Sequence, residues 1–250
     1  ILGTLYEKGT SPVNPVPQFG DNVVAMNLAS GILAALYRKQ KTGLGDKVTV
    51  SIYQSAMFMF NLVITGSQYG FAYPVSRKAV TNPFLNTYKS KDDRWLQLAC
   101  PEYDRMFPVM MQAIGRADLI GNEKYSTAAS IAGHTTETIE VIEAQIAQKT
   151  ADDWMDIFDK CDVPCEKALL WDEIAKDEQA WANDYLYKMH YPNGQARTLV
   201  EPPVKFDSIG KPAHKPGPAI GENNGEILRE LGYSAEQIEK LAADKVIVRG

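Results

Sequence analysis

Residues that commonly hold metals or form disulfide frameworks are scarce in this sequence. Its 250 residues include three cysteines and three histidines. An odd number of cysteines in a chain of this length does not make a disulfide framework and is typical of a reducing compartment, so we predict a cytoplasmic protein. His134, His190 and His214 are scattered and form no closely spaced ligand pair, so we predict no metal site.

An excess of basic charge and a long apolar run are also missing. The 26 Lys and Arg residues are outnumbered by 31 Asp and Glu, for a formal net charge of −5. This balance lacks the electrostatic footprint of proteins that bind nucleic acid or anionic membranes. The most apolar stretch, residues 55–65, is shorter than the roughly 18 residues of a transmembrane helix and contains Asn61. We therefore expect neither nucleic acid nor membrane among the partners.

The beginning of the sequence shows no targeting signal. It opens on Ile1 rather than Met, without the pattern of a signal peptide. The proline-containing residues 7–20 predict an extended approach segment. These opening residues resemble the interior of a longer protein, so we expect further sequence before Ile1. The composition, 45% hydrophobic and 23% charged, is that of an ordinary globular protein with room for one or two domains.

Alternating helix and strand signals predict an α/β fold. A helix is expected from Asp21 through Tyr37, ended by Gly43, because basic residues followed by glycine are a common helix stop. The β-branched, alternating residues 47–52 predict a strand, and the apolar residues 53–68 predict a second long helix.

A change of composition near residue 70 predicts a second domain. Residues 70–90 contain glycine and prolines typical of a crossing between domains. Beyond it we predict strands at 95–99 and 163–169 and helices at 102–114, at 135–148 and after a capping Thr150. The last part predicts a hairpin with its turn at Pro192-Asn193-Gly194, and a final helix capped by Ser234.

Common catalytic motifs do not occur. The sequence has no phosphate-binding glycine loop and no Gly-x-Ser-x-Gly elbow. Cys161 and Cys165 have the wrong spacing for a redox pair, so we predict that they and Cys100 are ordinary buried or half-buried thiols. We expect His190 to be a strand side chain.

Asp21 is the strongest candidate for chemistry. It lies between Gly20 and a predicted helix, where backbone N–H groups are free and the helix dipole is positive. An aspartate in this place commonly caps its helix. It can also act as a nucleophile or base, because carboxylates form covalent acyl intermediates and N–H groups stabilise an oxyanion. The local sequence leaves both interpretations open.

Several stretches taken together resemble the class III CoA-transferases, the formyl-CoA transferase-like family. The resemblance is carried by Phe19-Gly20-Asp21, by Lys41-Thr42-Gly43-Leu44-Gly45-Asp46-Lys47-Val48, and by residues 177–186, 203–206 and 221–233. Residues 5–10 and 177–186 are most similar to the branch acting on 2-hydroxy acids from amino-acid fermentation, the 2-hydroxyisocaproate and phenyllactate CoA-transferases. Residues 82–88 lack the glycine run of formyl-CoA transferases, which argues against oxalate or formyl chemistry.

The resemblance implies a function and two site residues. CoA would pass from an acyl-CoA to a free carboxylic acid, and Asp21 would form first an acyl–aspartyl anhydride and then an aspartyl-CoA thioester. An aspartate carboxylate is a nucleophile without a partner base, which agrees with the absence of a paired histidine or serine. Ile52 matches a family position that contacts CoA. Coenzyme A thioester would be a substrate, with no permanently bound cofactor.

The resemblance also implies an architecture. Family members have a Rossmann-like large domain, a smaller α/β domain, and two subunits interlocked as a homodimer. Residues 1–70 and 176–250 would then belong to the large domain, which would be incomplete here, and residues 71–175 to the small domain with its linkers. Most CoA-binding residues would precede Ile1. Two alternatives remain: an acyl-CoA racemase of the same fold, which abstracts a proton from the α-carbon, or a non-catalytic dimerisation fragment in which Asp21 only caps its helix.

Overall fold

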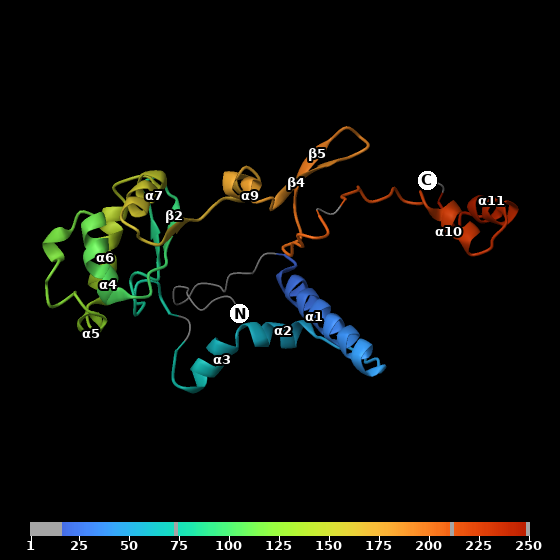
Figure 1. Cartoon of the computed structure of the whole chain (residues 1–250). Helices are drawn as coiled ribbons and strands as arrows, with labels where there is room; N and C mark the ends of the chain where they lie inside the picture. Colours follow the sequence, from blue (N-terminus) through green and yellow to red (C-terminus); the bar gives the residue numbers. More distant parts are fainter. Residues whose placement is uncertain (1–16, 73–74, 211–212, 249–250) are drawn as a thin grey trace. The chain divides into compact units, whose positions relative to one another are not determined.

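The computed structural model describes residues 17–72, 75–210 and 213–248 (Figure 1). Most of the predicted approach segment, residues 7–16, lies outside these ranges. The chain separates into two compact units, Ile1–Ala168 and Leu169–Gly250. Helices and two small antiparallel sheets alternate along the described residues, which confirms the predicted mixture of α and β elements.

The first described element is the long helix α1, Phe19–Thr42. It ends as predicted, because Gly43 takes the left-handed conformation with φ 77° and donates its N–H to the carbonyl of Lys39 at 2.8 Å. It begins earlier than predicted. Its N-cap is Gln18, which has φ 64° and makes no side-chain capping bond.

The predicted strand over residues 47–52 is wrong. Residues 44–51 are not part of any sheet, because a strand needs a neighbour to pair its backbone groups and no described strand lies beside them. The predicted helix over residues 53–68 is two helices, α2, Ile52–Met59, and α3, Asn61–Gln68. They separate at Phe60, where the Asn61 side chain donates to the carbonyl of Phe58 at 2.6 Å. Such local side-chain bonds compete with helical geometry.

Helix α1 is the one described helix long and apolar enough to cross a membrane by length and composition. An 18-residue window of it has a mean hydropathy of 1.3, and none of that window is buried. This helix is not an uninterrupted apolar run, because Asn22, Asn27 and Ser30 are among its residues. A core helix of a soluble protein can have the same length and mean hydropathy.

A compact α/β core occupies the rest of the first unit. Its sheet has the strand order β1-β2-β3, formed by Thr87–Lys89, Trp95–Leu98 and Cys165–Lys167. The helices beside it are α4 (Tyr103–Ala113), a 3-10 turn (Ala117–Leu119), α5 (Ala128–Ile131), α6 (Thr135–Ile146) and α7 (Ala151–Lys160) (Figure 1). The predicted strands and helices of this part are therefore confirmed.

Burial in this core follows the alternation of the sheet. On β2, Leu96 and Leu98 are fully buried whereas Trp95 and Gln97 point outward. Helix α6 contributes Ile139, Ile142 and Ile146, all fully buried. The spacing of three and four residues places these isoleucines on one helix face.

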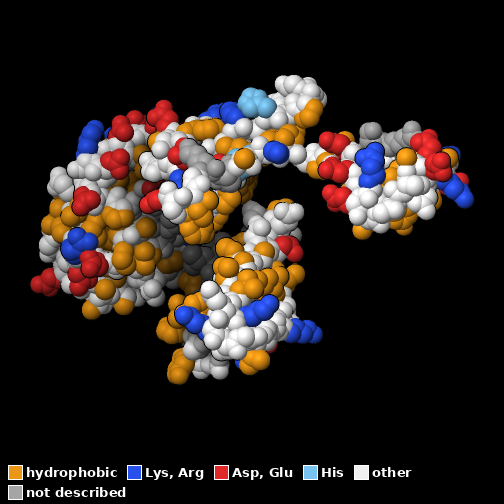
Figure 2. Space-filling model, turned by 45° about the vertical axis from the view of Figure 1, so that its right-hand side comes forward, with side chains coloured by type: hydrophobic (Ala, Val, Ile, Leu, Met, Phe, Trp, Pro, Cys, Tyr) orange, Lys and Arg blue, Asp and Glu red, His pale blue; other side chains and the backbone are white. Residues whose placement is uncertain are grey.

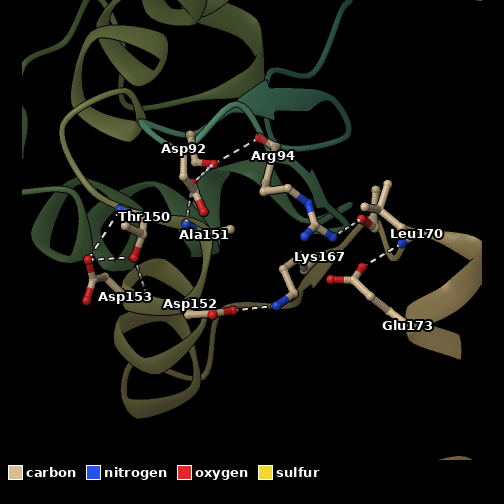
Figure 3. Close-up of polar contacts among 11 residues, drawn as sticks. Asp92, Arg94, Thr150, Ala151, Asp152, Asp153, Lys167, Leu170 and Glu173 are labelled. Carbon is tan, nitrogen blue, oxygen red and sulfur yellow. Dashed lines mark hydrogen bonds and ion pairs between the residues drawn. The ribbon is translucent and has the colours of Figure 1, made fainter. Parts of the chain in front are cut away.

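Polar contacts tie the turn between β1 and β2 to the start of α7 (Figure 3). The Asp92 carboxylate accepts hydrogen bonds from the Ser90 hydroxyl at 2.6 Å and from the N–H of Ala151 at 3.0 Å. The Ser90 bond above all lowers the pKa of Asp92 below its ordinary value. Thr150 caps α7 in a capping box with Asp153, as predicted.

The end of the first unit is held to the same region. The Lys167 ammonium pairs with Asp152 of α7, and the Arg94 guanidinium donates to the carbonyl of Ala168 at 3.0 Å (Figure 3). The core therefore extends to the last residues of its unit.

The second unit contains the predicted hairpin and C-terminal helices. Strands β4, Leu186–His190, and β5, Ala196–Val200, pair in register from Leu186 opposite Val200 to His190 opposite Ala196. His190 is a strand residue, as predicted. The helices are α8 (Trp171–Ile174), α9 (Glu178–Ala182), α10 (Asn224–Glu230) and α11 (Ala235–Ala243). Ser234 and Gln237 form the predicted capping box of α11.

A half-buried ion pair in the core makes its stability depend on pH. Glu143 of α6 lies 2.7 Å from the guanidinium of Arg77 and also pairs with Lys78. Burial alone would raise the pKa of Glu143, but the hydrogen bonds from Lys78 and Arg77 outweigh it, and the pKa is lowered. The unfolded chain therefore takes up its proton at a higher pH than the folded chain. The stabilisation is complete above the unfolded pKa of about 4.3 and is lost as the pH falls through the folded value.

We expect Glu143→Gln to flatten the acid dependence of stability. Between about pH 6 and pH 3, the urea midpoint should fall less steeply in this variant than in the parent protein. Glu140→Gln, an exposed position on the same helix, is the matched control and should keep the parent slope. Equal slopes for Glu143→Gln and the parent would contradict this assignment.

Candidate active site

Asp21 is the third residue of α1 and lies in its first turn. The capping interpretation is wrong, because the N-cap position belongs to Gln18. The Asp21 side chain is exposed, and within residues 17–72, 75–210 and 213–248 it makes no hydrogen bond or ion pair. A carboxylate in a first helical turn faces the positive end of the helix dipole. Asp21 is therefore an accessible carboxylate with no described structural partner.

The start of α2 lies against the start of α1. The hydroxyl of Ser51 caps α2 by accepting the N–H of Gln54 at 3.1 Å. Ile52 is the next residue, and its Cγ2 atom is 3.1 Å from the place that a Cβ on Gly20 would occupy. Since Gly20 directly precedes Asp21, the structure places the two predicted site residues in one neighbourhood.

Two helix N-termini converge at this neighbourhood. The first turn of any helix has N–H groups without a partner inside the helix. In α1 the N–H of Asn22 bonds back to the carbonyl of Gln18 at 2.9 Å, and in α2 Ser51 takes the N–H of Gln54. The earlier N–H groups of both first turns are the kind of donor that stabilises a developing oxyanion. A carboxylate and backbone donors of this kind therefore occur in the same part of the structure.

The segment around this neighbourhood exposes much apolar surface. Figure 2 shows hydrophobic side chains gathered over the part of the molecule formed by α1–α3. They include Leu33, Leu36 and Tyr37 of α1, Tyr53 and Phe58 of α2, and Leu62 of α3. Ile52 is itself half exposed, at 51%. An apolar side chain that is both accessible and close to Asp21 could contact a substrate.

The thiols take no part in this neighbourhood. Cys100 and Cys165 are buried in the α/β core, and Cys161 is half-buried, which confirms the prediction of ordinary thiols. Burial raises the pKa of Cys165 to about 12 and raises that of Cys100 as well. A thiol with a raised pKa is a poor nucleophile at neutral pH. Among the described residues, no cluster of three or more His, Cys, Asp or Glu side chains could hold a metal.

Sequence reasoning missed Gly20 as part of the site. It identified Asp21 from its place before a helix and Ile52 from the family resemblance. The sequence carries no signal for Gly20, because this residue directly precedes the predicted helix; the structure places it in the first turn of α1. The close approach of Ile52, which belongs to α2, explains why position 20 has no side chain.

The fold is that of known proteins. A solved CAIB/BAIF family protein from Brucella suis matches with a TM-score of 0.74 at 19% identity, over 90% of this chain and 58% of that protein. The sequence profile of CoA-transferase family III matches residues 2–224. The chain belongs to CoA-transferase family III.

Two curated relatives are similar over 99% of this chain. The cinnamoyl-CoA:phenyllactate CoA-transferase of Clostridium sporogenes is 46% identical over 252 aligned residues. The (R)-2-hydroxy-4-methylpentanoate CoA-transferase of Clostridioides difficile is 36% identical over 247. The match covers 61% of the first relative and 62% of the second. The chain thus spans about three fifths of the length of these curated relatives.

Proposed function

We propose that the protein containing this chain transfers CoA from an acyl-CoA to a free carboxylic acid, with Asp21 as the nucleophile. The observation that carries the proposal is the exposed Asp21 carboxylate in the first turn of α1, beside the start of α2. Its membership of CoA-transferase family III supports the reaction class. Both curated relatives are named for 2-hydroxy acids, so we propose a 2-hydroxy acid as a substrate.

The proposed reaction needs one carboxylate and four acyl transfers. An Asp21 oxygen attacks the thioester carbonyl, the carbon–sulfur bond breaks, and CoA thiolate leaves an acyl–aspartyl anhydride. The thiolate then attacks the aspartyl carbonyl, which releases the donor acid and forms an aspartyl-CoA thioester. The acceptor carboxylate attacks this thioester to form a second anhydride and thiolate. Attack of that thiolate on the acceptor carbonyl gives the new acyl-CoA and restores the Asp21 carboxylate.

The chain's own residues have separate parts in this reaction. Asp21 forms the covalent bonds, and the free N–H groups of the two first turns stabilise the tetrahedral oxyanions. Ile52 contacts the CoA substrate; the support for this role is its exposed apolar side chain beside Gly20, the chain neighbour of Asp21. No step requires a cofactor beyond the CoA thioester itself.

The proposal includes the wider architecture. Residues 1–70 and 176–250 belong to a Rossmann-like large domain, residues 71–175 form the small domain, and two subunits interlock in the cytoplasm. The buried core between Val75 and Cys165 supports the small domain. The exposed apolar side chains of α1–α3 support a larger domain around residues 17–70.

Mass spectrometry of single turnovers tests the reaction. The full-length protein containing these residues is mixed with cinnamoyl-CoA and a panel of 2-hydroxy acids. We expect new 2-hydroxyacyl-CoA products, and an Asp21 peptide that gains the mass of CoA joined as a thioester. Solvent deuterium at the acyl α-carbon without CoA exchange would instead indicate a racemase. No product and no adduct would indicate that the protein does not catalyse this transfer.

A further inference from the structure

The backbone conformation at Gly20 does not require a glycine. It is the second residue of α1, where the backbone is helical and open to any L-residue. The glycines with left-handed backbones are others, such as Gly43. Glycine in a helix is less favourable than alanine by roughly 0.5–1 kcal/mol. A reason for glycine must therefore come from the space around it.

That space is filled by Ile52. A Cβ at position 20 would lie 3.1 Å from the Ile52 Cγ2 atom, closer than ordinary van der Waals contact. A second contact of this kind lies further along α1, where a Cβ on Gly31 would be 2.8 Å from Cγ1 of Val48. The two glycines let the segment from Val48 to Ile52 run directly against the helix.

The two contacts differ in their distance from Asp21. Gly20 is its neighbour in the chain, whereas Gly31 is three helical turns away, or roughly 15 Å at 1.5 Å per residue. Widening the contact at Gly31 would loosen the packing of Val48. Widening the contact at Gly20 would move the start of α2 away from the first turn of α1, to which Asp21 belongs. Only the second change alters the groups around Asp21.

We propose that Gly20 is a positioning residue for Asp21, and this inference rests on the proposed function. The missing side chain lets Ile52 touch the first turn of α1 and fixes the spacing between the Asp21 carboxylate and the N–H groups that begin α2. A positioned donor stabilises developing charge without reorganisation, and small displacements of it are costly. Ile52 thereby has a steric role in the site through its Cγ2 methyl group.

The branching of the side chain at position 52 allows a matched test. Leucine has nearly the volume of isoleucine but no methyl group at Cγ2, whereas valine keeps that methyl group. Gly20→Ala should therefore be relieved by Ile52→Leu and not by Ile52→Val. Each double variant is compared with its own Ile52 single variant, so any effect of position 52 on CoA binding cancels.

The experiment measures kcat and KM of CoA transfer in the full-length protein. We expect Gly20→Ala to lower kcat by about 10- to 100-fold, the order of loss that a misplacement near 1 Å produces, with KM for acyl-CoA changed only about twofold. Adding Ile52→Leu should restore most of the kcat lost, whereas adding Ile52→Val should not. Gly31→Ala should lower the melting temperature and leave kcat unchanged. Unchanged kcat in Gly20→Ala, or equal rescue by leucine and valine, would overturn the proposal.

A second readout does not depend on enzymatic activity. The rate at which a water-soluble carbodiimide labels Asp21 is followed by mass spectrometry of its peptide. Gly20→Ala should change the labelling rate, because the groups around the Asp21 carboxylate would have moved, and Ile52→Leu should reverse the change. If the parent protein transfers no CoA, the proposed function fails while the labelling still decides the positioning. Identical labelling of parent and Gly20→Ala would show that Gly20 does not position Asp21.

Discussion

Replacing Asp21 with alanine should abolish CoA transfer. Every step of the proposed reaction makes or breaks a bond to this carboxylate, so we expect kcat to fall by at least about 10³-fold, as losses of covalent nucleophiles do. The fold should not change, because the side chain is exposed and makes no hydrogen bond or ion pair within the described part of the chain. The measurement is the rate of acyl-CoA exchange, alongside a thermal melt of the same sample.

Two further variants sharpen this result. Asp21→Asn keeps the shape of the side chain and should be equally inactive at first, although slow deamidation would restore activity on standing. Asp46→Ala is the matched control: Asp46 is an exposed aspartate of the same segment that pairs with Arg38. It should retain most of the activity. Substantial transfer by Asp21→Ala would exclude the aspartyl mechanism.

Replacing Trp154 with alanine should destabilise the α/β core more than any other single change considered. Trp154 is 2% exposed, stacks on Phe158 with ring centroids 5.4 Å apart, and donates its indole N–H to the carbonyl of Ile146 at 2.8 Å. Removing a buried tryptophan typically costs about 3–5 kcal/mol. Urea unfolding followed by circular dichroism measures this free energy without relying on the fluorescence that the substitution removes.

Companion variants separate packing from the hydrogen bond. Trp154→Phe keeps a ring but leaves the Ile146 carbonyl without its donor, so it should cost about 1–3 kcal/mol. Trp171→Ala removes an indole that is 77% exposed and should stay within about 0.5 kcal/mol of the parent. A loss below about 1 kcal/mol for Trp154→Ala would contradict the burial described for it.

Elements specified by neighbouring residues could be predicted from the sequence. Thr150 and Ser234 cap their helices because the partner side chain is three residues away, and Gly43 ends α1 because its own backbone can turn left-handed. The hairpin from β4 to β5 is set by its short turn. In each case the interaction that decides the structure lies within a few residues.

Features that depend on distant residues could not be predicted. The strand predicted at residues 47–52 does not form. Alternating β-branched residues favour an extended chain, but a sheet also needs a neighbouring strand, which they do not provide. Of the two interpretations left open for Asp21, the capping one failed because the helix begins earlier, at Phe19. The candidate site was predictable as two separate positions, Asp21 and Ile52. Their proximity depends on a glycine that only tertiary contact explains.

The order of the core along the chain bears on how the protein is made. The buried residues of the α/β core all lie between Val80 and Cys165, within one part of the sequence. A ribosome therefore delivers all of them before the second unit begins at Leu169. Domains generally fold as units during synthesis, so this core can close while the hairpin and the C-terminal helices are still being translated. It would then be a folded body at the time the remaining elements emerge.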